Sequence, residues 1–481
     1  MKEYKLFING EDVASSTNTI TDDINPWTGE VFAKVHMASK EDIDKAIDSA
    51  DKASEEWAET PAKVREAVLL KAASLIEQRA EEIRDILIYE AGSTFGKAMF
   101  ETFETADVFR VAAGEARRVT GQTHSSNTAN VLSYSVRRPL GVIAGISPFN
   151  FPMILAGKKI SMAIAAGNTF VLKPSTNTAV CGLIFAEIFK EAGLPDGVLN
   201  VIPCSSSVLG ETFQKDKRVK MITFTGSTAA GRVIAKSAAE YFTKVTLELG
   251  GKSPIIVLND ADIDYAVDTA TFGIFFHQGQ VCMVGSKVIV EEGVYDEFCE
   301  KFAKKVSGLK SGEPTDHTVV IGPLIEKKQC SFVQGLVDDA LSKGAKALSG
   351  NKSNGPVYEA TVLSDIDESM NVFHEEVFGP VVSVIKAKDS DHAVALANNT
   401  VYGLSSAVIT NDLGKALKMS KNIEAGMVHV NSPTVQDEVN SPFGGVKESG
   451  MGREGGHFSI EEMTELKWVT LEPSGNRQYP F

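Results

Sequence analysis

Three side chains stand in sequence contexts where they could do chemistry. Cys282 follows a Gln-Gly-Gln loop at the end of a helical stretch, a polar setting with room for a substrate, although a lone cysteine is most often a small buried apolar residue. Glu248 ends an apolar strand before Gly-Gly, where a carboxylate costs free energy unless it has a task or a salt bridge to a lysine such as Lys252. Asn150 lies in the loop SPFNFP (147–152) after a strand, where its amide either satisfies the loop backbone or contacts a ligand. The sequence thus offers a candidate nucleophile, a carboxylate in need of a function and a candidate ligand contact.

A glycine-rich segment, FTGSTAAG (224–231), joins an apolar strand to a helix-like stretch. It holds only two of the three glycines of the usual dinucleotide fingerprint, and a structural turn explains it nearly as well as a nucleotide site. A strand before and a helix after are nonetheless the context in which a phosphate binds at a helix N-terminus. The segment is therefore a candidate phosphate site.

Composition limits the kinds of partner. The chain has 481 residues, with 48 basic and 63 acidic side chains and a net charge of -15. This charge repels phosphate backbones and argues against a nucleic-acid partner. The five cysteines and eight histidines show no spacing typical of zinc or redox sites, so we expect free thiols, no metal and a reducing compartment, the cytoplasm. The N-terminus lacks a signal-peptide core and prolines interrupt the uncharged stretch 139–157, so we expect no membrane segment.

The hydrophobic pattern indicates the elements that must position these residues. The first expected elements are helical: Ser39 and Asp42 form a capping arrangement, and apolar helical faces run through 64–92 and 103–118. From residue 139 onward, short strands and helices alternate, which indicates a doubly wound parallel sheet that binds ligands beyond the carboxyl ends of its strands. The expected strands are 140–146, 169–172, 198–202 and 221–225, and the expected helices are 152–165, 178–192 and 228–241.

A second alternation follows the segment 244–258. Its expected helices are 261–276, 294–307, 324–343 and 390–398, with a strand at 381–387. The pattern therefore predicts two α/β units with a boundary near Gly250 and Gly251. The segments 131–137 and 464–472 look like exposed strands without a place in either sheet.

Together these features resemble the aldehyde dehydrogenase superfamily over essentially the whole chain. Seven motifs occur in the family's order and spacing: SPFNFP (147–152), VLKPS (171–175), FTGS (224–227), LELGGKSP (247–254), GQVC (279–282), EEVFGP (375–380) and SPFGGVKESGMGR (441–453). The resemblance implies an α/β fold with two doubly wound parallel-sheet domains and a small bridging β-sheet, which would hold the two orphan strands.

The resemblance also implies a division of the chain. The dinucleotide-binding domain is expected to comprise 1–119 and 139–251, and the catalytic domain 252–449. A bridging and oligomerising segment would comprise 120–138 and 450–481. We expect a homo-oligomer, a dimer or a tetramer, because lone strands such as 466–472 leave unpaired edges that another subunit can complete.

By resemblance, the reaction is NAD(P)-dependent oxidation of an aldehyde to a carboxylic acid. Cys282 occupies the nucleophile position and would form a thiohemiacetal and then a thioester. The side-chain amide of Asn150 and the backbone N–H of Cys282 would hold the oxyanion. Glu248 would act as general base toward the water that hydrolyses the thioester.

The family motifs also assign the cofactor and substrate contacts. Lys173 would contact the adenosine ribose and Glu376 the nicotinamide ribose, with Phe378 packed near the nicotinamide. Ser227 and the helix after Gly226 would face the pyrophosphate. The other expected cofactor contacts are Ile146, Ser147, Phe149, Ser175, Thr176, Gly210, Gly231 and Leu249. The residues expected to line the aldehyde site are Asn150, Phe151, Cys282 and Phe443.

The substrate class is open to several interpretations. The run 435–443 and the ending YPF look most like the aromatic-aldehyde branch, the benzaldehyde, vanillin and salicylaldehyde dehydrogenases. The alternative is an aliphatic aldehyde or semialdehyde; a semialdehyde would need a cation in the tunnel, and the sequence does not reveal where Lys158 and Lys159 point. Coenzyme A-acylating members lack the general-base glutamate, so Glu248 favours hydrolysis. A catalytically silent protein would be free to lose Cys282, Glu248 or Asn150, and all three are present.

Cofactor choice gives a first testable prediction. Strictly NAD-preferring members commonly carry a glutamate three residues after the ribose-contacting lysine, and this sequence has Thr176 there. A glutamate would repel a 2′-phosphate, whereas Thr176 and Ser175 offer neutral hydroxyls beside Lys173. We therefore expect the wild type to use NADP and NAD, and Thr176→Glu to lower kcat/KM for NADP much more than for NAD. An equal effect on both cofactors, or a wild type inactive with NADP, would contradict this.

Overall fold

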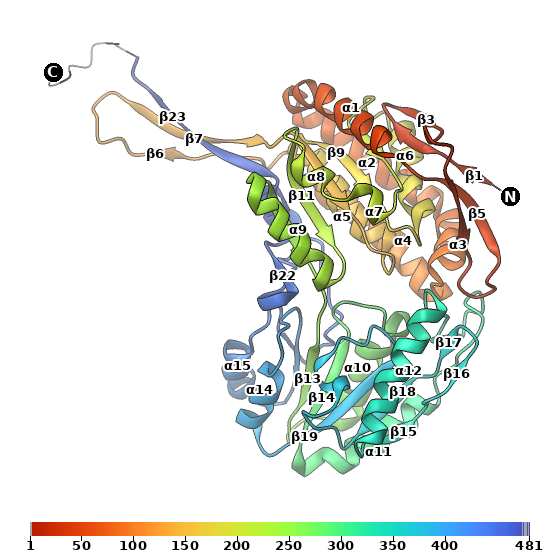
Figure 1. Ribbon diagram of the computed structural model, residues 1–481. Helices are drawn as coiled ribbons and strands as arrows, with labels where there is room; N and C mark the ends of the chain where they lie inside the picture. The colour runs from red at the N-terminus through yellow and green to blue at the C-terminus, as the bar shows by residue number, and fades with distance from the viewer. Residues whose placement is uncertain (1, 474, 476–478, 480) are drawn as a thin grey trace.

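Two mainly parallel sheets form the centres of the two lobes seen in Figure 1. The computed structural model describes residues 2–473, 475, 479 and 481. In the first sheet β12, β11, β8, β9 and β10 run parallel, and antiparallel strands close both edges. Its strands, in spatial order, are β22 (Gly450–Met451), β12 (Lys244–Glu248), β11 (Val219–Thr225), β8 (Val142–Ile146), β9 (Thr169–Lys173), β10 (Leu199–Val201), β2 (Leu6–Ile8) and β3 (Glu11–Val13).

The second sheet is parallel except at one edge, where β15 joins antiparallel. In spatial order its strands are β15 (Lys346–Ser349), β18 (Thr361–Ser364), β19 (Val381–Ala387), β14 (Gly285–Glu291), β13 (Ser253–Val257), β20 (Ala407–Ile409) and β21 (His429–Val430). The expected fold, two doubly wound parallel sheets with a small extra sheet, is thus confirmed. The central strands are buried along their whole length, as expected when helices cover both faces.

Two of the helices that flank the first sheet begin at residues typical of helix N-termini. Ser39 and Asp42 form the expected capping box, in which Ser39 Oγ accepts the Asp42 N–H and the Asp42 carboxylate accepts the Ser39 N–H. Pro152 occupies the first turn of α5, where a missing N–H costs nothing. The helices of this lobe are α1 (Lys40–Glu59), α2 (Ala62–Gln78), α3 (Ala80–Ala91), α4 (Phe95–Ala116), α5 (Pro152–Ala166), α6 (Ala179–Ala192), α7 (Ser206–Leu209), α8 (Thr212–Lys215) and α9 (Thr228–Tyr241).

The second lobe has its own set of helices. They are α10 (Ile263–Phe275), α11 (Tyr295–Ser307), α12 (Lys327–Ser342), α13 (Asn371–His374), α14 (Ser390–Asn398) and α15 (Leu413–Asn422). A last helix, α16 (Gly456–Glu462), packs back on α5 of the first lobe. Among the described residues, no helix is long and apolar enough to cross a membrane.

The two orphan strands pair with each other. β7 (Leu132–Pro139) and β23 (Thr464–Leu471) run antiparallel over their whole length, and β6 (Thr123–His124) completes a small sheet. This sheet projects from the body as an arm (Figure 1). Leu466 and Trp468 are exposed on β23, with 57% and 70% of their surface accessible.

Two expectations about the elements were wrong. The first elements are strands, because β1 (Glu3–Tyr4), β2, β3, β4 (Ile20–Ile24) and β5 (Val31–His36) precede α1; these are short strands that carry little periodic signal. The apolar face at 64–92 belongs to two helices, α2 and α3, which meet at Arg79. By contrast, the segment 244–258 divides at Gly250 and Gly251, as expected, into β12 and β13, which lie in different sheets. A separate hairpin joins β16 (Ser353–Asn354) and β17 (Val357–Tyr358).

Candidate active site

A polar cavity of about 470 Å³ opens at the carboxyl ends of the first sheet. Because β8, β9, β11 and β12 are parallel, their carboxyl ends meet at one edge, and the loops that follow them face the same space. The cavity lining includes most of the predicted cofactor contacts: Ile146, Ser147, Phe149, Lys173, Ser175, Thr176, Gly226, Ser227, Leu249, Glu376 and Phe378. Asn150, Glu248 and Cys282 line it as well.

Two predicted contacts lie outside the lining of this cavity. Gly210 ends the short helix α7 with a positive φ of 52°. Gly231 lies behind Leu249, and a Cβ atom there would lie 2.4 Å from Leu249 Cδ2. The structure also adds Gln329 and Phe332 of α12 to the lining, two residues that no motif in the sequence singled out.

The second sheet contributes to the site from the amino ends of its strands. Cys282 lies three residues before β14, and Glu376 and Phe378 lie shortly before β19. The rule that ligands bind beyond carboxyl ends therefore describes the first sheet only. The carboxyl ends of the strands of the first sheet and the amino ends of the strands of the second sheet therefore both border the cavity.

The junction of the two lobes has no room for side chains at two positions. A Cβ atom at Gly250 would lie 2.4 Å from Oε2 of Glu376, and one at Gly251 would lie 2.5 Å from the carbonyl oxygen of Cys282. The backbone N–H of Gly251 donates a hydrogen bond to Oε1 of Glu376 at 2.9 Å. This bond and the contact with Cys282 join the chain directly after Glu248 to both contributions of the second lobe.

Cys282 is delivered by a tight turn in an unusual backbone conformation. His277, Gln278 and Gly279 have φ values of 51°, 45° and 74°, and the left-handed region costs a non-glycine residue about 1–3 kcal/mol where it is strained. Side-chain bonds hold the turn: Gln278 Nε2 donates to the carbonyl of Pro323 at 2.8 Å, and Gln280 Oε1 accepts the N–H of Ile325 at 3.1 Å. The sequence identified the thiol but not this turn.

Asn150 is held by a buried ion pair that sequence reasoning missed. Lys97 Nζ donates to the carbonyl of Asn150 at 2.7 Å and pairs with Glu101 one helical turn away. The other oxygen of Glu101 accepts the N–H of Met153 at 2.8 Å. The side-chain amide of Asn150 donates to the carbonyl of Gln280 at 2.9 Å, which brings the amide beside the turn that carries the thiol. An i,i+4 Lys–Glu pair on a helix is usually a surface feature, so the sequence gave no reason to bury this one.

Glu248 is buried without a hydrogen-bonding partner. Neither of its carboxyl oxygens, nor Nζ of Lys252, has a partner among the described residues, so the alternative salt bridge is not formed. Burial, with Glu454 nearby, raises the pKa of Glu248 well above its usual value. Gly444 backs the carboxyl group, since a Cβ atom at this residue would lie 2.8 Å from Oε1. A buried acid without a hydrogen-bonding partner in the wall of a cavity is a candidate for proton exchange there.

The pKa values of the Cys282 thiol and the Glu376 carboxyl are also shifted. Burial raises the pKa of Cys282, and the negative charges of Glu248, Glu376 and Asp437 raise it further. Burial raises the pKa of Glu376 to about 7, against the opposing effects of the Gly251 N–H and Lys252. Lys173, at the end of β9, is buried as well, and burial lowers the pKa of its ammonium group.

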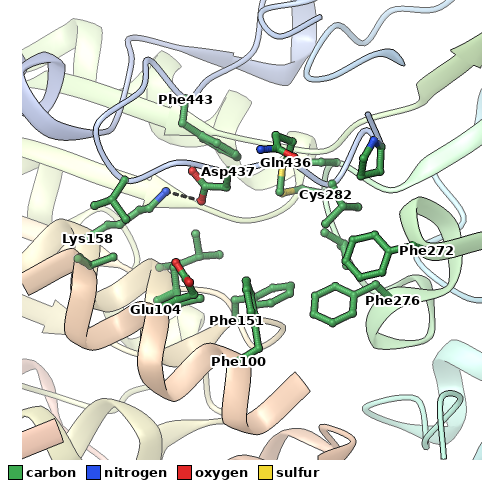
Figure 2. A pocket seen from close by; sticks show the side chains of 18 residues that line it. Phe100, Glu104, Phe151, Lys158, Phe272, Phe276, Cys282, Gln436, Asp437 and Phe443 are labelled. Atoms are coloured by element: carbon green, nitrogen blue, oxygen red, sulfur yellow. Dashed lines mark hydrogen bonds and ion pairs between the residues drawn. The ribbon is translucent and has the colours of Figure 1, made fainter. Parts of the chain in front are cut away.

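A second cavity, of about 290 Å³, lies on the other side of Cys282 and is largely aromatic (Figure 2). Phe276 contacts three other rings of its wall. The ring centroid of Phe276 lies 5.2 Å from the centroid of Phe272, 5.7 Å from that of Phe100 and 6.1 Å from that of Phe151. The predicted substrate residues Phe151, Cys282 and Phe443 line this cavity, whereas Asn150 lines the polar one. Phe100, Phe272 and Phe276 were missed, although the i,i+4 spacing of Phe272 and Phe276 places them on one face.

Only one of the two neighbouring lysines reaches the aromatic cavity. Lys158 lines it and pairs with Asp437 at 2.5 Å. Lys159 lies outside the lining and bonds to Thr223 and Glu454. The structure thus settles a direction that the sequence left open.

Comparison with known proteins agrees with this geometry. Residues 13–469 match the model of the aldehyde dehydrogenase family. A benzaldehyde dehydrogenase of Bacillus subtilis is 40% identical over 99% of this chain and 98% of its own length, and a vanillin dehydrogenase of Corynebacterium glutamicum is 40% identical over 98% of both. The crystal structure of a salicylaldehyde dehydrogenase from Pseudomonas putida G7, complexed with salicylaldehyde, is 38% identical, superposes with a TM-score of 0.98 and covers 100% of both chains. The chain belongs to the aldehyde dehydrogenase family.

Proposed function

We propose that the protein oxidises an aromatic aldehyde to the carboxylic acid with NAD or NADP, and that Cys282 is the nucleophile. One observation carries the proposal: among the described residues, Cys282 alone lines both the polar cavity and the aromatic cavity. A thiol placed there can contact a bound aldehyde from one side and a bound dinucleotide from the other. The names of the similar proteins, which include benzaldehyde, vanillin and salicylaldehyde dehydrogenases, support an aromatic substrate.

The polar cavity has the donor set that a dinucleotide requires. Lys173 and the hydroxyls of Ser175 and Thr176 supply a cation and neutral donors for the adenosine ribose. Ser227 caps the N-terminus of α9, where backbone N–H groups favour a phosphate. Glu376 can accept hydrogen bonds from the second ribose. When bound, the nicotinamide supplies the acceptor for the hydride.

The residues around the thiol account for the chemistry at the carbonyl carbon. The thiolate of Cys282 adds to that carbon and forms a thiohemiacetal, and loss of hydride from the same carbon leaves a thioester. Asn150 Nδ2, held beside the thiol by the bond to Gln280, and the backbone N–H of Cys282 stabilise the oxyanion. One such donor is worth about 2.7–4 kcal/mol of transition-state stabilisation.

Glu248 is assigned to hydrolysis of the thioester. A carboxyl with a raised pKa is a stronger base once ionised, and it takes a proton from the attacking water. Because the ionised form is required, this step speeds up as the pH rises through the raised pKa. The presence of Glu248 favours water over coenzyme A as acceptor, and the presence of all three catalytic side chains argues against a silent protein.

The aromatic cavity disfavours the semialdehyde alternative. A semialdehyde presents a carboxylate that needs a free cation, and the charge of Lys158 is already matched by Asp437. Glu104, a second carboxyl, also lines this cavity. Phenylalanine rings make up much of the remaining wall and suit a flat apolar ring.

The division of the chain and its assembly belong to the same proposal. We assign 1–119 and 139–251 to the dinucleotide-binding domain, 252–449 to the catalytic domain, and 120–138 with 450–481 to bridging. Within the last segment, β22 pairs with β12 and α16 packs on α5 before the chain enters β23. The five cysteines are free, which supports a reducing compartment, the cytoplasm.

Replacing the nucleophile tests the proposed function. Cys282→Ala should reduce kcat/KM for every aldehyde by about 10⁴-fold or more, because no other group can form the thioester. Binding of the reduced cofactor, followed by its fluorescence, should be unchanged. Cys299→Ala, at a half-buried cysteine of α11 outside both cavities, is the matched control and should keep wild-type turnover. Oxidation of benzaldehyde by Cys282→Ala near the wild-type rate would refute the assignment.

Assembly is tested by mass in solution. The arm formed by β6, β7 and β23 exposes apolar side chains and a strand edge, so we expect it to pair with another subunit in a dimer or tetramer. Light scattering at micromolar concentration should give at least twice the 51.7 kDa of one chain. A mass near 51.7 kDa would contradict the proposal.

A further inference from the structure

Gln329 lines the polar cavity but donates its hydrogen bonds to the backbone of the cavity wall. It lies in the first turn of α12 and is half-buried. Its Nε2 donates to the carbonyl of Val377 at 3.0 Å and to the carbonyl of Phe378 at 3.1 Å. An amide NH2 group has two N–H donors, so these two bonds occupy both of them. The donors of Gln329 therefore serve the loop 376–380 and are not available to a bound ligand.

The backbone of this loop is unusual at the residue that Gln329 holds. Phe378 has a φ of 49°, in the left-handed region, which a non-glycine residue keeps only where its surroundings hold it there. Besides the bond to Gln329, the Phe378 ring makes a T-shaped contact with Phe149, with the centroids 5.7 Å apart. The next residue packs against the same helix, since a Cβ atom at Gly379 would lie 2.7 Å from Cγ2 of Val333. Contacts with α12 thus fix the conformation of the loop.

The same loop touches the turn that carries the thiol. A Cβ atom at Gly279 would lie 2.2 Å from the carbonyl oxygen of Gly379, so the two backbones are in direct contact. The residues just before α12 bind this turn as well, through the carbonyl of Pro323 and the N–H of Ile325. One short segment, 323–329, therefore holds both the thiol turn and the loop.

We infer that Gln329 is a positioning residue for hydride transfer: it holds Phe378 in the left-handed conformation and so fixes the nicotinamide side of the cavity relative to Cys282. The inference rests on the proposed function, in which Glu376 and Phe378 contact the nicotinamide end of the cofactor. The hydride leaves the carbon bonded to the Cys282 sulfur for the nicotinamide, and the oxyanion on that carbon re-forms the carbonyl of the thioester. A misplacement of about 1 Å can lower the rate of such a step about 100-fold.

The test replaces the amide with side chains of similar length. Gln329→Met removes the donors and keeps a strong helix former, and Gln329→Glu keeps the shape but only accepts hydrogen bonds when ionised. On rapid mixing with saturating benzaldehyde and cofactor, both variants should form the first equivalent of reduced cofactor about tenfold or more slowly than the wild type. Benzaldehyde deuterated at the formyl carbon should then give a larger isotope effect on turnover than in the wild type, because hydride transfer has become limiting.

A second readout needs neither cofactor nor substrate. Hydrogen exchange of the free protein measures how readily a segment opens locally. Gln329→Met should speed exchange in the peptides that contain 376–380 and 277–282, two segments that lie far apart in the sequence but are joined through Gln329 and the Gly279–Gly379 contact. Faster exchange in 376–380 alone would leave the thiol turn uncoupled and would overturn the inference.

Two further variants separate position from general damage. Gln329→Lys keeps N–H donors and should recover most of the rate and of the slow exchange. Gln334→Met is the matched control on the same helix: Gln334 bonds to Asp338 at 2.8 Å and to Tyr358 at 3.2 Å, outside both cavities, and its loss should leave the rate and the exchange of both segments unchanged.

The contrary outcomes are distinct. A wild-type rate of hydride transfer in Gln329→Met or Gln329→Glu would overturn the inference, and either variant decides the question if the other does not fold. The same slowing in Gln334→Met would also overturn it. A wild type that reduces no cofactor with benzaldehyde or any other aldehyde would instead refute the proposed function.

Discussion

The absence of side chains at Gly250 and Gly251 is the constraint on which the site depends. At these two residues the chain leaves the first sheet and enters the second, and any Cβ atom would collide with Glu376 or with the carbonyl of Cys282. The close approach brings the carboxyl end of β12, which carries Glu248, against the amino ends of β14 and β19, which follow Cys282 and Glu376. Without it, Glu248 of the first lobe would lie apart from Cys282 and Glu376 of the second.

Buried polar contacts on both sides of this junction orient Asn150 and Cys282. The Lys97–Glu101 pair holds the backbone around Asn150, and the glutamines of the turn before Cys282 hold the thiol in place. Each of these groups costs free energy to bury, and its hydrogen bonds, which are charge-assisted for Lys97 and Glu101, offset that cost. The result is a thiol at the boundary of a polar and an aromatic cavity, with an amide donor on one side and an unpaired acid, Glu248, nearby.

The sequence allowed the prediction of local elements and contiguous motifs, because periodicity and caps are local properties. Helices such as α5, α6 and α9 and strands such as β8 and β19 lie within a few residues of their expected positions. It could not predict contacts across the chain. The pairing of β7 with β23 joins residues more than 300 positions apart. Lys158 and Asp437, which form an ion pair, are 279 positions apart in the sequence. The wall of the aromatic cavity combines Phe100 of α4 with Phe272 of α10. The early strands, which have two to six residues each, were missed because segments this short carry little periodic signal.

The central claim is that Cys282 forms a thioester that Glu248 helps water to cleave. The most direct measurement combines rapid mixing of Glu248→Gln, benzaldehyde and cofactor with mass analysis of the quenched protein. The account predicts a burst of about one equivalent of reduced cofactor per subunit, a slow steady state, and an acyl group on the peptide that contains Cys282. An unchanged steady-state rate without a burst, or an acyl group attached to any other residue, would contradict it.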